Sequence, residues 1–492
     1  MSQTLLKAQG IARKSIPAIL VVLLFALFFV SLFGEKHPYN DGAGFDGTFY
    51  REVFRNFSID FFAHGYDGFR IQRIFPFCAM NLVYGALNVP LDNSHMLWGM
   101  GVLHIFNLIL QVVFFFKLAI LRNWKKSTTA ILFSIFFFNY YVLKNCGYEL
   151  FQTDAFATTI ALVSYYLLLR DKFALSFAVS LLGLFTWPTI TTINLLLILF
   201  RQNLQPIPEE NRLGTILYRI TPAAYAFTAT GIITLLVVLH KQDALVQFLQ
   251  VDLSAGLLIL SLATAIALLW VLCKKGSFPF FYSPVQFYSI FSLKTAVLLI
   301  LPIIAIKVFL GFHTNEEVFF NGRVFLFQTL IRPLKYPAIT IAGHVAYLGI
   351  LLPLILLQFR RFSKHFVSIS PGHALAFIGF LLLAIDSEAR HIVTFLPIIL
   401  VPLGSVLDSL DLDPRKTAFL VILQLLLSHF YIPINIDGLA SSLTNLDFTS
   451  DAAQRFFMSF GPWMTFKSYL LWILASFAVF TAIWAVLRKT SP

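Results

Sequence analysis

The chain has 492 residues, of which 58% are hydrophobic and only 12% are charged, and its mean hydropathy is +0.80. This composition excludes a water-soluble globular protein of this length. The net charge of +12 does not indicate nucleic-acid binding, because the Lys and Arg residues cluster in short tracts between apolar runs, which is the pattern that orients membrane helices. Cys78, Cys146 and Cys273 are widely spaced in apolar or nearly apolar stretches and predict neither a disulfide framework nor a metal site.

Runs of roughly 17 to 25 apolar residues recur along the chain, each long enough to cross a hydrocarbon core about 30 Å thick as a helix. The alternating pattern of barrel strands is absent, so the predicted fold class is an all-α polytopic membrane protein with about 14 transmembrane helices. We expect one transmembrane domain over residues 1–492, since no soluble domain or low-complexity linker separates the runs. The predicted spans are residues 16–33, 96–121, 128–143, 153–169, 173–187, 189–200, 220–239, 255–273, 293–310, 340–357, 374–385, 392–407, 418–433 and 468–487.

Charged residues between the runs predict the orientation. Residues 16–33 follow a basic amino terminus and lack a small-x-small cleavage site, which favours an uncleaved first span over a signal peptide. With both termini in the cytoplasm, about 20 of the 36 Lys and Arg residues lie inside, and about 18 of the 24 Asp and Glu residues lie outside or at the outer edge. Pro188 interrupts the run 173–200 and favours two short crossings, whereas a single kinked helix would invert everything downstream.

Three outer segments are long: residues 34–95, 311–339 and 434–467. Charge within the spans is scarce and the acidic residues concentrate outside them, so we expect the functional residues in these segments. The first segment has the clearest pattern.

Residues 34–95 contain two Gly-aromatic-Asp-Gly boxes, which place Asp46 and Asp67 at turns. After the first box, Phe49, Val53 and Phe57 recur at helical spacing, which predicts a short helix on the membrane surface. An Asp before Gly is ordinarily a turn residue and a helix N-cap. A carboxylate just outside the bilayer could instead deprotonate an acceptor hydroxyl, if a sugar donor is anchored there by a polyprenyl chain.

Two arginines follow the second box. Arg70 and Arg73 are predicted to share a face of a second surface helix, which becomes increasingly apolar through Ile74 and Phe77. Each Asp therefore lies at a turn that leads into an interfacial helix.

The run GFDGTFY at residues 44–50, followed by FRIQRIFP at residues 69–76, resembles a signature of the bacterial GT-C-type glycosyltransferases, a mannosyltransferase-like integral membrane family. That signature reads Gly-Tyr-Asp-Gly-Gln-Phe-Tyr and then Tyr-Arg-x-Gln-Arg-Ile-Leu-Tyr-Pro, and the match covers about a tenth of the chain. The resemblance implies a GT-C-like bundle, juxtamembrane helices in the first outer loop, an acid there as catalytic base, and a polyprenyl-phosphate sugar donor. Thr48 replaces Gln and Phe75-Pro76 replaces Leu-Tyr-Pro, which leaves the donor's identity open.

A second acidic loop is predicted at Glu149 and Asp154, between the third and fourth spans. Similar enzymes often have acidic residues here, which could bind the acceptor or help to hold a divalent metal. The alternative is that Glu149 pairs with Lys144 and Asp154 caps a helix. No tight ligand spacing indicates a metal, and no other cofactor is predicted.

Residues 386–391, Asp-Ser-Glu-Ala-Arg-His, join the eleventh and twelfth spans. Arg390 resembles the donor-phosphate ligand of this fold class, and the planar guanidinium suits paired hydrogen bonds to phosphate. Glu388 could assist the acceptor or a metal, or could simply hold Arg390 as an interfacial arginine. His391 is a second candidate phosphate ligand, with a structural hydrogen bond as the alternative.

Further cations could face the leaving phosphate: Arg70, Arg73, Arg323, Arg332 and Lys335. Plain anchoring at the membrane interface explains the same residues. Both interpretations stay open at the level of sequence.

The predicted function is transfer of a sugar from a polyprenyl-phosphate donor to a cell-surface glycan, lipid or protein. The predicted location is the bacterial inner (plasma) membrane, with the active site facing outward and membrane lipid as solvent. Two alternatives are a flippase or transporter for a lipid-linked glycan, which would place ionisable groups near the membrane middle, and an O-antigen-type polymerase or ligase, which would use a late outer loop.

Overall fold

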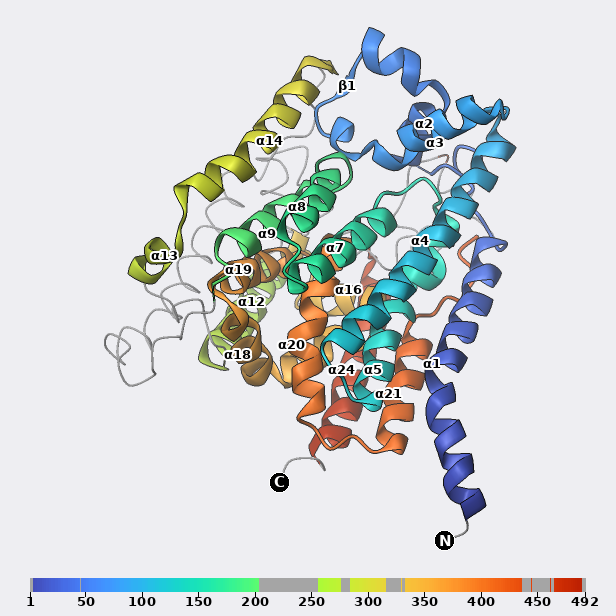
Figure 1. Ribbon diagram of the computed structural model, residues 1–492. Coiled ribbons are helices and arrows are strands. Elements are labelled where there is room, and N and C mark those ends of the chain that lie inside the picture. The colour runs from blue at the N-terminus through green and yellow to red at the C-terminus, as the bar shows by residue number, and fades with distance from the viewer. Residues whose placement is uncertain are drawn as a thin grey trace.

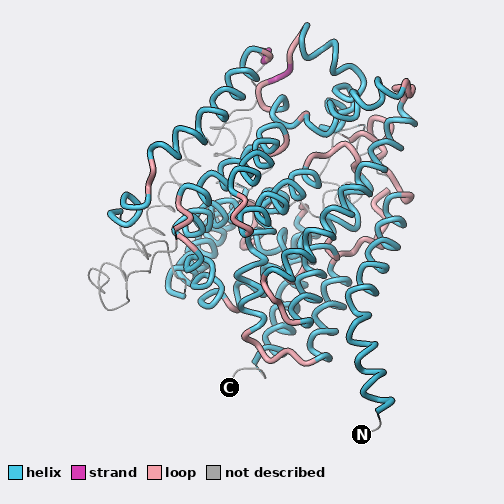
Figure 2. The backbone as a smooth tube through the Cα atoms, in the orientation of Figure 1, coloured by secondary structure: helices cyan, strands magenta, loops and turns pink. Residues whose placement is uncertain are grey.

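The computed structural model describes residues 3–44, 46–202, 255–275, 284–315, 332–435 and 464–488, with the single residues 329, 444 and 461. Most of the described chain is helical, and short loops join the helices (Figure 2). The protein is an all-α membrane protein. In the described parts, four helical segments are long and apolar enough to cross a membrane, or five when the bent pair Lys126–Phe137 and Tyr141–Tyr148 is one span.

The four long segments are α4 (Asn93–Leu121), α14 (Leu293–Phe312), residues Ala389–Asp408, and α24 (Phe466–Arg488). The third of these consists of a 3-10 segment, η7 (Ala389–Phe395), and α20 (Leu396–Asp408). The other helices are α1 (Gln3–Leu32), α2 (Asp46–Ala63), α3 (Phe75–Leu87), α5 (Lys126–Phe137), α6 (Cys146–Tyr148), α7 (Asp154–Leu169), α8 (Phe173–Leu181), α9 (Pro188–Leu199), α12 (Ala255–Lys275), α13 (Pro284–Ile290), α16 (Ile339–Leu348), α17 (Leu351–Leu357), α18 (Phe359–Ile369), α19 (Pro371–Ile385) and α21 (Pro414–Leu427). Shorter segments are η1 (Arg70–Arg73), η2 (Tyr141–Asn145, a π-helix), η3 (Leu182–Phe185), η6 (Arg332–Leu334), and the strands β1 (Tyr66–Asp67) and β2 (Thr314–Asn315).

Helices occupy the predicted apolar runs wherever the structure describes them, because hydropathy and helical periodicity are local properties of the chain. The predicted span 220–239 lies outside the described residues. The first-loop elements α2, α3 and β1 gather at one end of the bundle, and the start of α1 lies at the other end (Figure 1).

The break at Pro188 produces a helical hairpin. Trp187 has an extended backbone and Pro188 is the first residue of α9, where a missing N–H is tolerated. Across the hairpin, the Ser176 hydroxyl donates to Asn194 Oδ1 (3.1 Å) and the Thr191 hydroxyl donates to the Ser180 carbonyl. These contacts make α8 and α9 antiparallel, so the chain returns to the side that it left, and the alternative of one kinked helix is wrong.

The helix α18 was not predicted. The basic tract Arg360, Arg361 and Lys364 lies in α18, where Phe359, Phe362 and Phe366 are buried and the three cations are exposed. The polar residues concealed this amphipathic helix from a search for continuous apolar runs.

Residues 34–95, the predicted first outer loop, fold into α2, β1, η1 and α3. The prediction of a helix after the first box is confirmed, with Val53 fully buried. The second box leads into a 3-10 turn, η1, and then α3 begins at Phe75, so Arg70 and Arg73 are not in one continuous helix with Phe77.

The two strands join the first loop to the distant end of α14. β1 pairs with β2 in parallel, with Tyr66 opposite Thr314 and Asp67 opposite Asn315. Gly65 adopts a positive φ of 66°, and a Cβ at this position would overlap the His313 carbonyl oxygen. Only glycine fits both requirements.

A second set of long-range contacts lies at the end of α1. The Glu35 carboxylate contacts the Lys144 ammonium and accepts hydrogen bonds from the backbone N–H groups of Ile434 (2.7 Å) and Asn435 (2.8 Å). Tyr148 also donates to Asn435 Oδ1 (2.6 Å). Lys144 therefore pairs with Glu35, and the predicted pairing with Glu149 is wrong.

Candidate functional site

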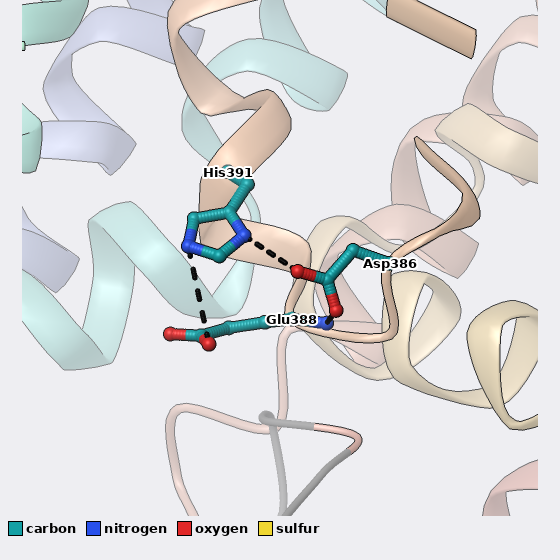
Figure 3. Close-up of side chains that lie close together, drawn as sticks. All are labelled: Asp386, Glu388 and His391. Atoms are coloured by element: carbon teal, nitrogen blue, oxygen red, sulfur yellow. Dashed lines mark hydrogen bonds and ion pairs between the residues drawn. The ribbon is translucent and has the colours of Figure 1, made fainter. Parts of the chain in front are cut away.

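The site is built around the turn between α19 and η7. The Asp386 carboxylate accepts the backbone N–H of Glu388 (3.1 Å), which closes the turn after α19. His391 Nδ1 lies 2.7 Å from Asp386 Oδ2, and His391 Nε2 lies 3.9 Å from Glu388 Oε2 (Figure 3). All three side chains are buried.

Arg332 joins this turn from the segment that precedes α16. Its Nη1 lies 3.1 Å from Asp386 Oδ2 and 2.6 Å from Glu388 Oε2, and its side chain is only 8% exposed. A buried charge pair of this kind is strongly destabilising to break, because removal of one partner leaves the other unpaired. Arg332 therefore already pairs with two carboxylates. These contacts disfavour its predicted role as a phosphate ligand.

Arg390 lies on the other side of Glu388. Its Nε contacts Glu388 Oε1, as the interfacial-arginine alternative predicted, and its side chain is 24% exposed. Asp154 and Asp46 also act on the Arg390 guanidinium electrostatically. This arginine consequently lies where acidic residues from the start of α2 and the start of α7 approach the 386–391 turn.

Glu149 and Asp154 flank the short loop between α6 and α7, and this loop packs against the start of α2. A Cβ on Gly47 would lie 3.1 Å from Phe151 Cβ, so a larger side chain would push the two loops apart. Asp154 is buried, and its Oδ1 has no hydrogen-bond partner among the described residues. Asp154 is the first residue of α7, whose N-cap is Thr153.

Burial raises the pKa of Glu149 from 4.5 to about 8, although Arg390 acts in the opposite direction; Asp154 and Asp46 add to the rise. His37 Nε2 lies 3.7 Å from Glu149 Oε1, and burial lowers the pKa of His37 to about 3. At neutral pH this contact therefore joins an uncharged imidazole to a protonated carboxyl group.

Asp46 and Asp67 differ in how their carboxylates are used. Asp67 Oδ1 accepts the backbone N–H groups of Phe69 (3.1 Å) and Arg70 (2.9 Å), which is the turn-forming role expected of Asp before Gly. Asp46 begins α2, and its side chain is 51% exposed and lies 3.5 Å from Arg70 Nη2. Arg70 Nη1 lies 3.7 Å from Asp67 Oδ2, so Arg70 bridges the two boxes.

Arg73 reaches the tip of the α8–α9 hairpin. Its guanidinium carbon lies 4.2 Å from the ring centroids of both Phe69 and Trp187, an arrangement that stabilises the cation between two aromatic faces. Trp187 in turn lies edge-on to His391, with ring centroids 6.0 Å apart. Tyr50, on α2, interacts electrostatically with Arg73.

The Asp386, Glu388 and His391 ligand atoms lie within 4.8 Å of one another, which is close enough for one metal ion. However, the Arg332 guanidinium contacts both carboxylates. A divalent cation bound among them would lie beside the positive charge of this arginine and be repelled by it. The donor set therefore fits an acid pair bridged by arginine better than it fits a metal site.

Most of the residues predicted from the sequence converge at this end of the bundle: Asp46, Glu149, Asp154, Glu388, Arg390 and His391 directly, and Arg73 and Arg70 at its border. Arg323 lies outside the described residues. Lys335 is buried, its ammonium lies 5.8 Å from the Tyr336 ring centroid, and burial lowers its pKa to about 8.

Four residues of this region were not predicted as site residues from the sequence: Asp386, Trp187, Tyr50 and His37. Asp386 had a signal, since it begins the same charged run as Glu388. Trp187 also had one, because it precedes the proline that breaks a span. Tyr50 had a signal as well, since it ends the GFDGTFY run, whereas His37 had no distinguishing pattern.

In comparisons with known proteins, no family model, no curated protein and no solved structure matches the chain.

Proposed function

We propose that this chain is a membrane-embedded glycosyltransferase of GT-C type. It transfers a sugar from a polyprenyl-phosphate-linked donor to a hydroxyl group of a glycan, lipid or protein acceptor. The proposal includes a bundle of about 14 spans, with both termini cytoplasmic and the site facing outward at a bacterial plasma membrane.

The observation that supports this proposal most strongly is the convergence of Asp46 with Arg390. Asp46 is a half-exposed carboxylate at the start of a surface helix, and it acts electrostatically on Arg390 from a segment far away in sequence. Glycosyl transfer from a lipid phosphate needs both groups: a base for the acceptor hydroxyl, and a cation for the phosphate that leaves.

In the proposed reaction, the acceptor hydroxyl gives its proton to Asp46 while its oxygen attacks the anomeric carbon. The bond between that carbon and the phosphate oxygen breaks, and the bonding electrons leave with the polyprenyl phosphate. Arg390 and Arg73 stabilise the phosphate charge through their guanidinium groups. Asp46 then releases its proton to water.

Asp46 is a better base than Asp67 on geometric grounds. Two backbone N–H groups engage Asp67, whereas among the described residues Asp46 contacts Arg70 and is more exposed to an incoming hydroxyl. Glu149 is protonated at neutral pH and is therefore suited to donate a hydrogen bond to the acceptor rather than to accept its proton.

Replacement of Asp46 by Asn tests the proposal. The variant keeps the size of the side chain and removes the basic carboxylate, so stability should change by no more than about 1 kcal/mol. The transfer rate from a panel of polyprenyl-phosphate-linked sugars should fall by roughly 10² or more, while binding of the donor is largely retained.

Two variants serve as controls. Asp60→Asn removes the same charge from the same helix, α2, far from the Arg390 turn, and should leave the rate unchanged. Asp67→Asn should have a smaller effect than Asp46→Asn. A folded Asp46→Asn protein that transfers sugar at the normal rate would show that Asp46 is only a helix-terminal residue.

A further inference from the structure

A cavity of about 390 Å³ lies between α1, α4 and α5. This volume falls in the range of about 300–1,000 Å³ that is typical of sites for small ligands. α4 begins beside the first outer loop, where Arg51 donates to Asn93 Oδ1 (3.0 Å), and it has 29 residues. A helix of this length spans about 40 Å. The cavity is at its far end and is separate from the proposed active site.

The inner wall of the cavity is apolar. Leu20 of α1, Phe116 and Ile120 of α4, and Phe133 of α5 line it. These three helices lie side by side in Figure 1, and α4 is one of the segments able to cross a membrane. A wall of this chemistry at the end of a spanning helix suits a hydrocarbon chain.

The rim of the cavity is polar and basic. Asn123, Lys126 and Thr129 line it, and Lys126 is exposed. The neighbouring Lys125 ammonium donates to the Asp408 carbonyl (2.7 Å), whereas Lys126 is the lysine that lines the cavity. A cation at the mouth of an apolar cavity is complementary to a ligand with an anionic head and an apolar tail.

We propose that this cavity binds an anionic phospholipid of the surrounding membrane. One acyl chain lies between α1, α4 and α5, and the headgroup phosphate contacts Lys126 with hydrogen bonds from Asn123 and Thr129. Basic pockets between membrane helices select anionic lipids in this way. This site does not depend on the proposed transferase activity.

Trp124 also lines the cavity and provides a spectroscopic probe. The purified full-length protein is titrated in detergent micelles with brominated phosphatidylglycerol or brominated phosphatidylcholine, and tryptophan quenching is recorded. Because the chain has seven Trp residues, the Trp124→Phe variant is measured in parallel, and the difference isolates Trp124. Phosphatidylglycerol should reach half-maximal quenching of Trp124 at roughly one fifth of the phosphatidylcholine concentration, since one basic residue contributes about a fivefold preference.

Lys126→Gln should abolish this preference, and Lys364→Gln is the matched control. Lys364 is another exposed lysine, on α18, and does not line the cavity, so the control should keep the preference. Equal quenching by the two lipids would overturn the proposal, because an annular lipid of any charge would then explain the contact. An equal effect of the two lysine variants, or displacement of the lipid by inorganic phosphate, would also overturn it.

Discussion

Arg390 lies between two sets of acidic groups. Glu388 contacts its Nε, and Asp154 and Asp46 act on it from the outer loops. A guanidinium in this position can bind a phosphate through paired hydrogen bonds while one edge stays fixed to Glu388.

Substitution of Arg390 tests its proposed role. Arg390→Lys keeps the charge and loses the planar fork, whereas Arg390→Ala loses both, so donor KM should rise more in the Ala variant. Arg361→Ala, an exposed arginine on α18, should leave donor KM unchanged. Near-normal and equal donor kinetics for the two Arg390 variants would argue against phosphate binding.

The raised pKa of Glu149 predicts that the stability of the folded protein depends on pH. Its pKa is about 8 in the folded protein and 4.5 ordinarily, so the folded state retains a proton that the unfolded state loses as pH rises above about 4.5. The favourable contribution of this group is complete below pH 4.5 and is lost as pH rises through about 8. The melting temperature in detergent should therefore fall between pH 6 and pH 9.

Glu149→Gln should reduce that slope, because glutamine has no proton to lose. Glu52→Gln is the control, since Glu52 is 42% exposed and pairs with Arg55 on the surface of α2. Identical pH profiles for the wild type and Glu149→Gln would mean that Glu149 is not protonated in the folded protein.

At the scale of elements, the pairing of β1 with β2 fixes the first outer loop to the end of α14. Gly65 permits the close approach. Gly65→Ala places a Cβ on the His313 carbonyl and also strains a positive φ, so it should destabilise the protein by about 1–3 kcal/mol. Hydrogen exchange at Tyr66, whose N–H donates to the His313 carbonyl (3.0 Å), should become faster.

Gly85→Ala is a suitable control for this experiment. Gly85 lies in α3, and a Cβ there meets no atom within 4 Å, so Ala should stabilise the helix by about 0.5–1 kcal/mol. If Gly65→Ala is as stable as Gly85→Ala, the strand pair does not hold the loop.

At the scale of the whole molecule, the predicted orientation depends on the cations between helices. Arg122, Lys126, Arg361 and Lys364 are exposed, and in the predicted topology they face the cytoplasm. The two ends of the antiparallel α8–α9 hairpin lie on the same side. The predicted orientation of the segments that follow is therefore the same whether the hairpin crosses the membrane or only enters it.

Single-cysteine labelling with an impermeant reagent tests the orientation. In a background without native cysteines, Ser94→Cys at the start of α4 should be labelled from outside in intact cells. Arg122→Cys, just after the end of α4, and Lys364→Cys should react only after the membrane is permeabilised. Labelling of Lys364→Cys but not Arg122→Cys from outside would show that the two positions lie on opposite sides of the membrane, contrary to the predicted topology.

The sequence by itself determined the membrane class, the positions of most helices, and the acidic boxes of the first loop. These features follow from hydropathy, helical period and turn chemistry, which act over a few residues. Tertiary structure decided the pairing of charges: Lys144 with Glu35 rather than Glu149, and Arg332 with Asp386, 54 positions away. The helix α18 was within reach of a search for helical period, since Phe359, Phe362 and Phe366 recur at helical spacing. The charge pairing was not accessible from local pattern, because the partner of a buried charge is chosen by packing of segments that are distant in sequence.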